Sequence, residues 1–65
     1  MKPCYWITHL NSFDMELDGE RVLRVEGDDD ANEAALKAAL QKMVSSNVFE
    51  AGDKLVISEG ETEED

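Results

Sequence analysis

Apolar and acidic residues alternate without error in one short stretch near the N-terminus. The segment Phe13-Asp14-Met15-Glu16-Leu17 places three apolar side chains on one side and two acids on the other. A period of two is typical of a half-buried β-strand. Strand-forming residues over Cys4–Leu10 predict an earlier strand, and Arg21–Glu26 predicts a third. Turn signals at Asn11-Ser12 and Asp18-Gly19 separate the three, so we expect an antiparallel meander.

The apolar period changes to that of a helix in the second half of the chain. Leucine, methionine and valine recur at helical spacing over Ala31–Val44. Asp30 followed three residues later by Glu33 predicts a capping box at the helix start. Lys54–Ser58 predicts the last strand, parallel to the third and placed beside the first. The expected fold class is therefore α/β (α+β), a two-layer sandwich of order β-β-β-α-β with one helix on a mainly antiparallel four-stranded sheet.

The expected register decides which strand residues are buried. A two-residue loop at Asn11-Ser12 pairs Thr8 with Met15 and places Trp6 on the buried face. Tyr5 and Ile7 then lie on the outer face with His9, where an uncovered strip of this kind is a candidate interface. Two alternatives stay open: the strip is a dimer face, or the strand alternation is off by one residue.

Charge is the most unusual property of this chain. Its 65 residues contain 16 acids and 6 bases, which give a formal charge of −10. We expect one α+β domain over residues 1–58 and a disordered acidic tail over 59–65. The tail holds five acids and no base, so the domain itself keeps a charge of −5. Such a surface repels nucleic acids and anionic lipid and is attracted to basic protein surfaces.

Residues that could carry chemistry are few. Cys4 is the only cysteine and His9 the only histidine, so neither an internal disulfide nor a Cys/His zinc cluster can form. The expected register places these two on opposite faces, which argues against a cysteine nucleophile with a histidine base. We therefore expect a protein with no catalytic residue and no cofactor. We expect no membrane-spanning stretch and no signal peptide, and we expect the protein in the cytoplasm.

A run of aspartates invites comparison with a calcium loop. Asp28-Asp29-Asp30 followed by Asn32 has oxygen donors at the first, third and fifth positions. The sixth position requires a glycine, and Glu33 stands there instead. Helix capping explains these acids better than a metal site does, so we expect no metal.

The chain resembles small acidic phage-encoded inhibitors, including anti-CRISPR proteins and other DNA mimics, in its size, acidity and lack of an active site. It is similar more narrowly to the small host RNA polymerase inhibitor of short-tailed coliphages. The resemblance extends over about two thirds of the chain. The pieces that match within it are Tyr5-Trp6, Asn32-Glu33-Ala34-Ala35-Leu36, and Ala51-Gly52 before Leu55-Val56-Ile57. The resemblance implies a fold and an inhibitory role, and it transfers no site residue.

Two function classes follow from these patterns. The first is a non-enzymatic inhibitor that mimics nucleic acid and binds a basic, nucleic-acid-binding host protein such as a CRISPR effector. The second is a small adaptor that binds protein through the outer sheet face, at Tyr5 and Ile7. Either protein would contact neither nucleic acid nor membrane directly and would be a monomer or a weak homodimer. The inhibitor would use acids on ordered elements, where they can occupy phosphate-binding sites. These acids are Asp14, Glu16, Asp28, Asp29, Asp30 and Glu33.

Overall fold

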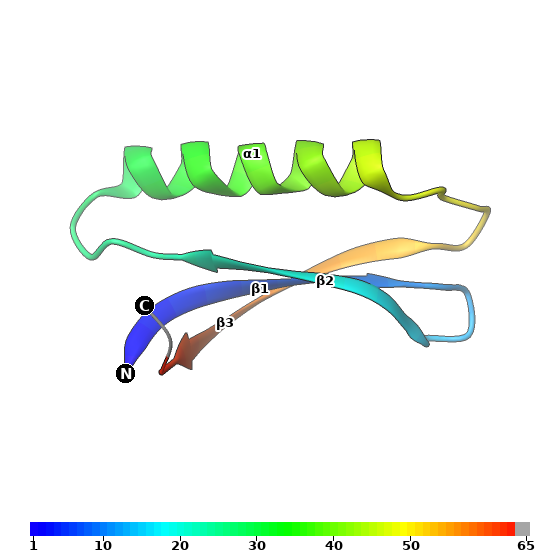
Figure 1. Ribbon diagram of the computed structural model, residues 1–65, viewed down its shortest axis with the longest axis horizontal. Helices are drawn as coiled ribbons and strands as arrows, with labels where there is room; N and C mark the ends of the chain where they lie inside the picture. The colour runs from blue at the N-terminus through cyan, green and yellow to red at the C-terminus, as the bar shows by residue number, and fades with distance from the viewer. Residues whose placement is uncertain (64–65) are drawn as a thin grey trace.

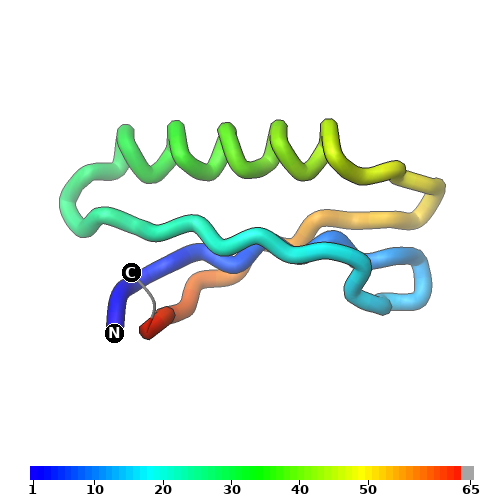
Figure 2. Tube along the Cα trace, viewed as in Figure 1, coloured from blue at the N-terminus to red at the C-terminus, as the bar shows by residue number. Residues whose placement is uncertain are grey.

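One helix lies on one face of an antiparallel sheet in the computed structural model of this protein, which describes residues 1–63 (Figures 1 and 2). The elements are β1 (Lys2–Leu10), β2 (Glu16–Leu23), α1 (Asp29–Ser46) and β3 (Lys54–Thr62). Within the described part of the chain the sheet has three strands in the order β2-β1-β3. The α+β class is confirmed, whereas the expected fourth strand is missing from the sheet.

The second and third predicted strands are one strand. β2 runs straight through Asp18-Gly19, and these two residues pair with His9 and Thr8 of β1. Gly19 is part of this strand, and its φ is not in the left-handed region. A tight two-residue hairpin turn would require that region. A single long strand can pair along most of β1, which two short strands joined by a turn could not do. The expected meander is therefore wrong at this point.

The last strand lies where it was expected, beside the first. β3 pairs antiparallel with the whole of β1, from Lys2 opposite Thr62 to Leu10 opposite Lys54. β1 is therefore the central strand and has neighbours on both sides. β3 also includes residues 59–62, which the sequence assigned to the acidic tail. The end of that predicted tail, residues 64–65, lies outside the described residues.

The two faces of β1 are inverted relative to the expectation. Ile7 and His9 are each only 1% exposed and face α1, while Trp6 is 40% exposed on the uncovered face. Phe13, expected in the core, is 82% exposed. Alternation shows which side chains share a face, but it does not show which face a helix will cover. This structure corresponds to the off-by-one alternative.

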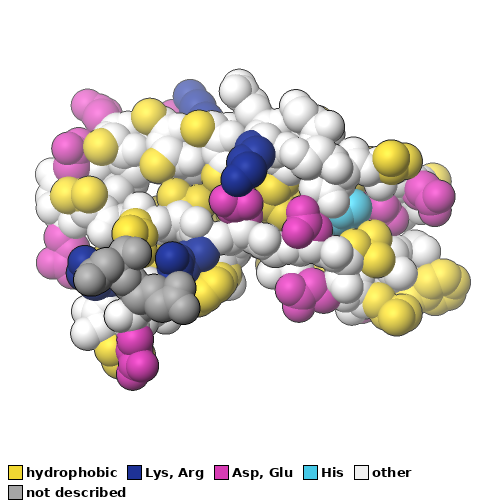
Figure 3. Space-filling view, viewed as in Figure 1, with side chains coloured by type: hydrophobic (Ala, Val, Ile, Leu, Met, Phe, Trp, Pro, Cys, Tyr) yellow, Lys and Arg dark blue, Asp and Glu magenta, His cyan; other side chains and the backbone are white. Residues whose placement is uncertain are grey.

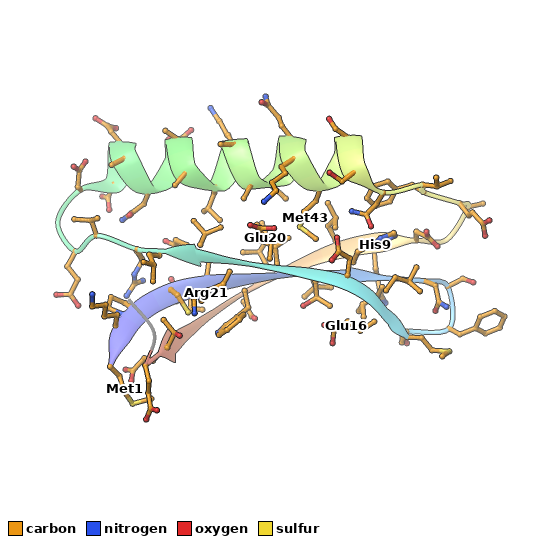
Figure 4. The ribbon with its side chains drawn as sticks, in the orientation of Figure 1. Met1, His9, Glu16, Glu20, Arg21 and Met43 are labelled. Carbon is orange, nitrogen blue, oxygen red and sulfur yellow. The ribbon has the colours of Figure 1, made fainter. Side chains whose placement is uncertain are left out.

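The core is correspondingly small. Ile7, Val22 and Met43 form its buried centre, and partly buried residues of α1, Leu36 and Leu40 among them, pack around it. Figure 4 shows Met43 pointing from the helix toward the sheet. A core of this size supplies little net stability. Each buried side chain therefore accounts for a large share of the whole.

Polar side chains attach the helix to the sheet at both of its ends. Asp28, rather than the expected Asp30, is the N-cap, and its carboxylate accepts a hydrogen bond from the N–H of Ala31 at 3.1 Å. The buried Asn32 carboxamide bonds both backbone groups of Val25, each at 2.8 Å. At the other end, Asn47 donates to the Met43 carbonyl at 2.8 Å and to Asp18 at 3.0 Å, from an extended conformation.

The loop between β1 and β2 is longer than the expected two residues because Asn11 organises it. Its side-chain oxygen accepts from the N–H groups of Phe13 (2.8 Å) and Met15 (3.0 Å). Asp14 adopts the left-handed conformation, which aspartate tolerates. Gly52 supports this loop from the α1–β3 connection: its φ is +91°, and a Cβ there would lie 2.8 Å from the Ser12 Cβ.

Substitution on β1 and in its loop tests the inverted faces. Ile7→Ala should lower the free energy of unfolding by about 2–5 kcal/mol, because it leaves a cavity in a fully buried site. Phe13→Ala should change it by no more than about 0.5 kcal/mol, because the ring is exposed. Urea unfolding followed by circular dichroism measures both. A larger loss for Phe13→Ala than for Ile7→Ala would restore the faces expected from the sequence.

The Asn32 contact can be tested in the same way. Asn32→Ala removes two hydrogen bonds with the backbone of Val25, each worth about 0.5–1.5 kcal/mol net. We expect the free energy of unfolding to decrease by about 1–3 kcal/mol. Gln41→Ala, on the exposed side of the same helix, is the matched control and should be neutral. Equal stability of the two variants would contradict the role given to Asn32.

Candidate protein-binding surfaces

The start of α1 carries four of the acids expected to bind a partner. Asp28 is the N-cap, Asp29 and Asp30 occupy the first turn, and Glu33 forms an ion pair with Lys37 at 3.1 Å. Acids at this position also interact favourably with the helix dipole. The helix backbone holds these acids in a fixed arrangement that faces solvent.

The other two expected acids lie at the opposite end of the molecule. Asp14 is in the β1–β2 loop, where it pairs with Lys54, and Glu16 begins β2. In Figure 1 this hairpin and the start of α1 mark opposite ends of the long axis, along which the molecule measures 37 Å. The structure therefore separates the six acids into two groups, and one basic patch on a partner would contact one group or the other.

Two further acids, which the sequence analysis did not select, lie on β2 between these groups. Glu20 points toward the helix side and pairs with Lys42 of α1 at 3.3 Å (Figure 4). Asp18 accepts hydrogen bonds from the Asn47 carboxamide and from the N–H of Gly19, and these bonds lower the pKa of its carboxyl. The alternation of β2 would have revealed this pair, had the strand been read through Gly19.

A shallow depression of about 240 Å³ lies near the start of α1. Tyr5 and Arg24 form one part of its lining, and the guanidinium lies 5.6 Å from the centre of the tyrosine ring. Arg24 also pairs with Glu59 at 3.1 Å. The remaining lining residues are Val25, Glu26, Gly27, Asp29 and Asn32. The lining holds one base, Arg24, and two acids, Glu26 and Asp29, so the depression does not favour an anion.

His9 belongs to a buried polar contact. Its Nε2 lies 3.0 Å from Oδ2 of Asp53, and its ring stacks on Phe49 with centroids 4.2 Å apart. The N–H of Glu50 donates to the same carboxylate at 3.1 Å. These two donors, the Glu50 N–H first and His9 second, lower the pKa of Asp53. The contact fastens the α1–β3 connection to the sheet, and it leaves His9 on the opposite face from Cys4, as expected.

The face of the sheet away from α1 is uncovered, and it differs from the face that was expected. Tyr5 and Ile7, predicted as interface residues, lie on the helix side, where Ile7 is part of the core. Trp6 takes their place at the centre of the uncovered face, with its indole over Gly60. A Cβ on that glycine would lie 2.9 Å from the indole Nε1. We call this surface the open sheet face.

Strand register defines the members of the open sheet face. Trp6 and Arg21, which pair with each other, lie near its centre among apolar and small residues, and its other charged residues lie toward its two ends. Its residues are Lys2, Cys4, Trp6, Thr8 and Leu10 of β1, Glu16, Gly19, Arg21 and Leu23 of β2, and Lys54, Val56, Ser58, Gly60 and Thr62 of β3. Three bases and one acid thus lie on this face. Among residues 1–63, the other thirteen acids and three bases lie elsewhere, for a charge of −10.

Comparison with known proteins adds nothing to this geometry. No family model matches the chain, and neither the curated proteins nor the solved structures contain a match. Among residues 1–63, no three His, Cys, Asp or Glu side chains are grouped so that they could hold a metal ion. Over the same residues, no helix has the length and apolar character that crossing a membrane requires.

The lowered pKa of Asp53 predicts a pH dependence. A carboxyl with a depressed pKa stabilises the fold above its unfolded value, about 3.9, and this stabilisation is lost as the pH falls through the folded value. Asp53→Asn should therefore be less stable than the wild type at neutral pH, and the difference should shrink below about pH 4. Urea unfolding at a series of pH values measures the difference. Asp30→Asn is the control, and an Asp53→Asn difference that stayed constant with pH would contradict the prediction.

Proposed function

We propose that this protein is a non-enzymatic, cytoplasmic inhibitor that binds a basic, nucleic-acid-binding surface of a host protein by nucleic-acid mimicry. The observation that carries the proposal is the separation of charge: outside the open sheet face, residues 1–63 have a charge of −10. Lys/Arg sites that hold phosphates accept carboxylates at similar positions. A CRISPR effector or a host RNA polymerase is a target of the right chemistry.

The acids of the helix start are the stronger of the two candidate docking groups. Asp29, Asp30 and Glu33 lie on one ordered helix, so they lose little conformational entropy when they dock. Each group has one acid in an ion pair, Glu33 with Lys37 and Asp14 with Lys54, so the helix start keeps the larger number of other acids. Figure 3 shows acidic side chains along the helix-covered half of the molecule and at its ends, where a basic groove could contact them.

The adaptor hypothesis proposed Tyr5 and Ile7 as the residues that bind a partner. Neither is available for that role, because Ile7 is buried and Tyr5 packs against the core. A protein-binding role for the open sheet face would have to use Trp6 and its neighbours instead. That role needs no basic groove on the partner, so its salt dependence would be weak. This difference allows a direct test between the two hypotheses.

The test begins with the proteins of a bacterial lysate that bind and elute from DNA-cellulose. The immobilised protein should retain specific members of this fraction, and mass spectrometry identifies them. Competing duplex DNA should release them, and retention should fall as salt rises, because exposed charge pairs are screened over about 8–10 Å at physiological ionic strength. Retention that is unaffected by both DNA and salt would contradict mimicry.

Charge reversal at the two ends identifies the docking group. Asp29→Lys combined with Glu33→Lys should weaken binding of the retained protein by at least about tenfold, since several charge-assisted contacts are lost together. Asp14→Lys combined with Glu16→Lys changes the net charge by the same amount at the hairpin, and it is the matched control. If the control weakens binding equally, only net charge matters and no ordered array is recognised.

A further inference from the structure

Within residues 1–63 no element covers the open sheet face, although two of its members, Cys4 and Thr62, are buried. Trp6, Leu23 and Val56 are each about 40% exposed on it. A folded monomer of this mass is expected to expose about 4,200 Å². This chain exposes 4669 Å², about 500 Å² more. An excess of that size is comparable to one side of a small protein–protein interface.

The shape of the face suits a second sheet. The β1–β2 hairpin and the far ends of β1 and β3 all bend away from α1, so the face is hollow along the strands (Figure 1). Figure 3 shows the same hollow on the lower side of the molecule. A twisted sheet that is concave along its strands is convex across them. Two copies that cross at near right angles would therefore fit together, as in orthogonal sheet packing.

The distribution of charge favours a second copy of this chain as the partner of the open sheet face. Two molecules of charge −10 repel each other, and they can approach best through the surface that carries the fewest acids. Among residues 1–63 the open sheet face is that surface, with Lys2, Arg21 and Lys54 against one acid, Glu16. Lys54 is paired with Asp14, and Arg21 donates to Thr62 at 3.1 Å. These bases have partners within the chain, so the face does not require an acidic partner.

The available area sets the strength of the association. A strand of nine residues is about 30 Å long, and three strands are about 14 Å wide, which gives about 840 Å² for two copies. This area is below the roughly 1,200 Å² at which stable interfaces begin, and it is typical of weak, transient association. The dimer should therefore dissociate at micromolar concentrations.

We propose that two copies of this chain pack open sheet face to open sheet face and form a symmetric four-layer dimer with both helices outward. The dimer places the two acidic helix sides on opposite surfaces. This proposal is independent of the proposed function, because it concerns the other face of the sheet.

Trp6 is the only tryptophan, so its fluorescence reports directly on this face. Between about 1 and 500 μM, analytical ultracentrifugation should show the mass doubling, while Trp6 emission shifts to the blue over the same range. Higher salt should strengthen the association, because it screens the repulsion between like charges. Salt should weaken binding to a basic target, so the two proposals can fail separately.

Variants of matched charge locate the interface. Val56→Glu and Ser58→Glu place a carboxylate on the open sheet face, and the second removes no apolar side chain. Each should raise the dissociation constant at least about tenfold, since a charge buried without a partner is costly. Val48→Glu adds the same charge at an 85% exposed position outside this face and should dimerise like the wild type. Circular dichroism establishes that each variant is folded.

Three results would overturn the proposal. The first is a wild-type chain that stays monomeric over the whole concentration range with an unchanged Trp6 emission. The second is normal dimerisation by a folded Ser58→Glu variant, which would place the interface elsewhere. The third is growth beyond two copies, which indicates head-to-tail contacts rather than a symmetric pair.

Discussion

One helix can cover only one face of a sheet, and most features of this molecule depend on that limit. α1 lies over the face of β1 that carries Ile7 and His9, and the core is confined to the space between them. The hydrophobic effect acts on area removed from water, so a single covered face gives a small stabilisation. Specific polar contacts, such as that of Asn32 with Val25, consequently hold the helix in place.

The same limit divides the surface into two parts with different properties. The helix side carries acids on α1 and β2, and several of them are held by hydrogen bonds or ion pairs, as Asp18 and Glu20 are. The open sheet face carries few acids and has a tryptophan at its centre. Proteins gain solubility from net charge, and they associate through surfaces where charge is sparse. The division therefore supports separate roles for the two sides.

The sequence predicted the class of the fold, the helix and the place of the last strand, because periodicity and crossover rules act locally. It did not predict the face that α1 covers. Phe13-Asp14-Met15-Glu16-Leu17 alternates well, yet Asn11 draws the start of this segment into a loop and leaves Phe13 exposed. Asp18-Gly19 has the composition of a turn, but pairing with the full length of β1 overrides that preference. Both errors come from tertiary contacts that no short window of sequence contains.

The same contacts explain what could be predicted of the candidate sites. Acids at a helix start can be recognised from sequence, and Asp28, Asp29, Asp30 and Glu33 do lie together. Tyr5 and Ile7 were assigned to an interface through the face of β1, and they moved to the core when that face inverted. Trp6 took their place for the same reason. A prediction of surface residues on a strand is only as good as the prediction of what covers it.

The central position of β1 has a consequence for the way the chain folds. β1 is made first during synthesis, yet its partner β3 is made last, and Lys2 pairs with Thr62. Contacts between residues so far apart in sequence form slowly, because a long loop must close before they contribute. Until then the N-terminal strand can pair only with β2, and its other edge is available to any exposed strand of another chain. Synthesis of β3 and its pairing with β1 are thus the events that complete the sheet.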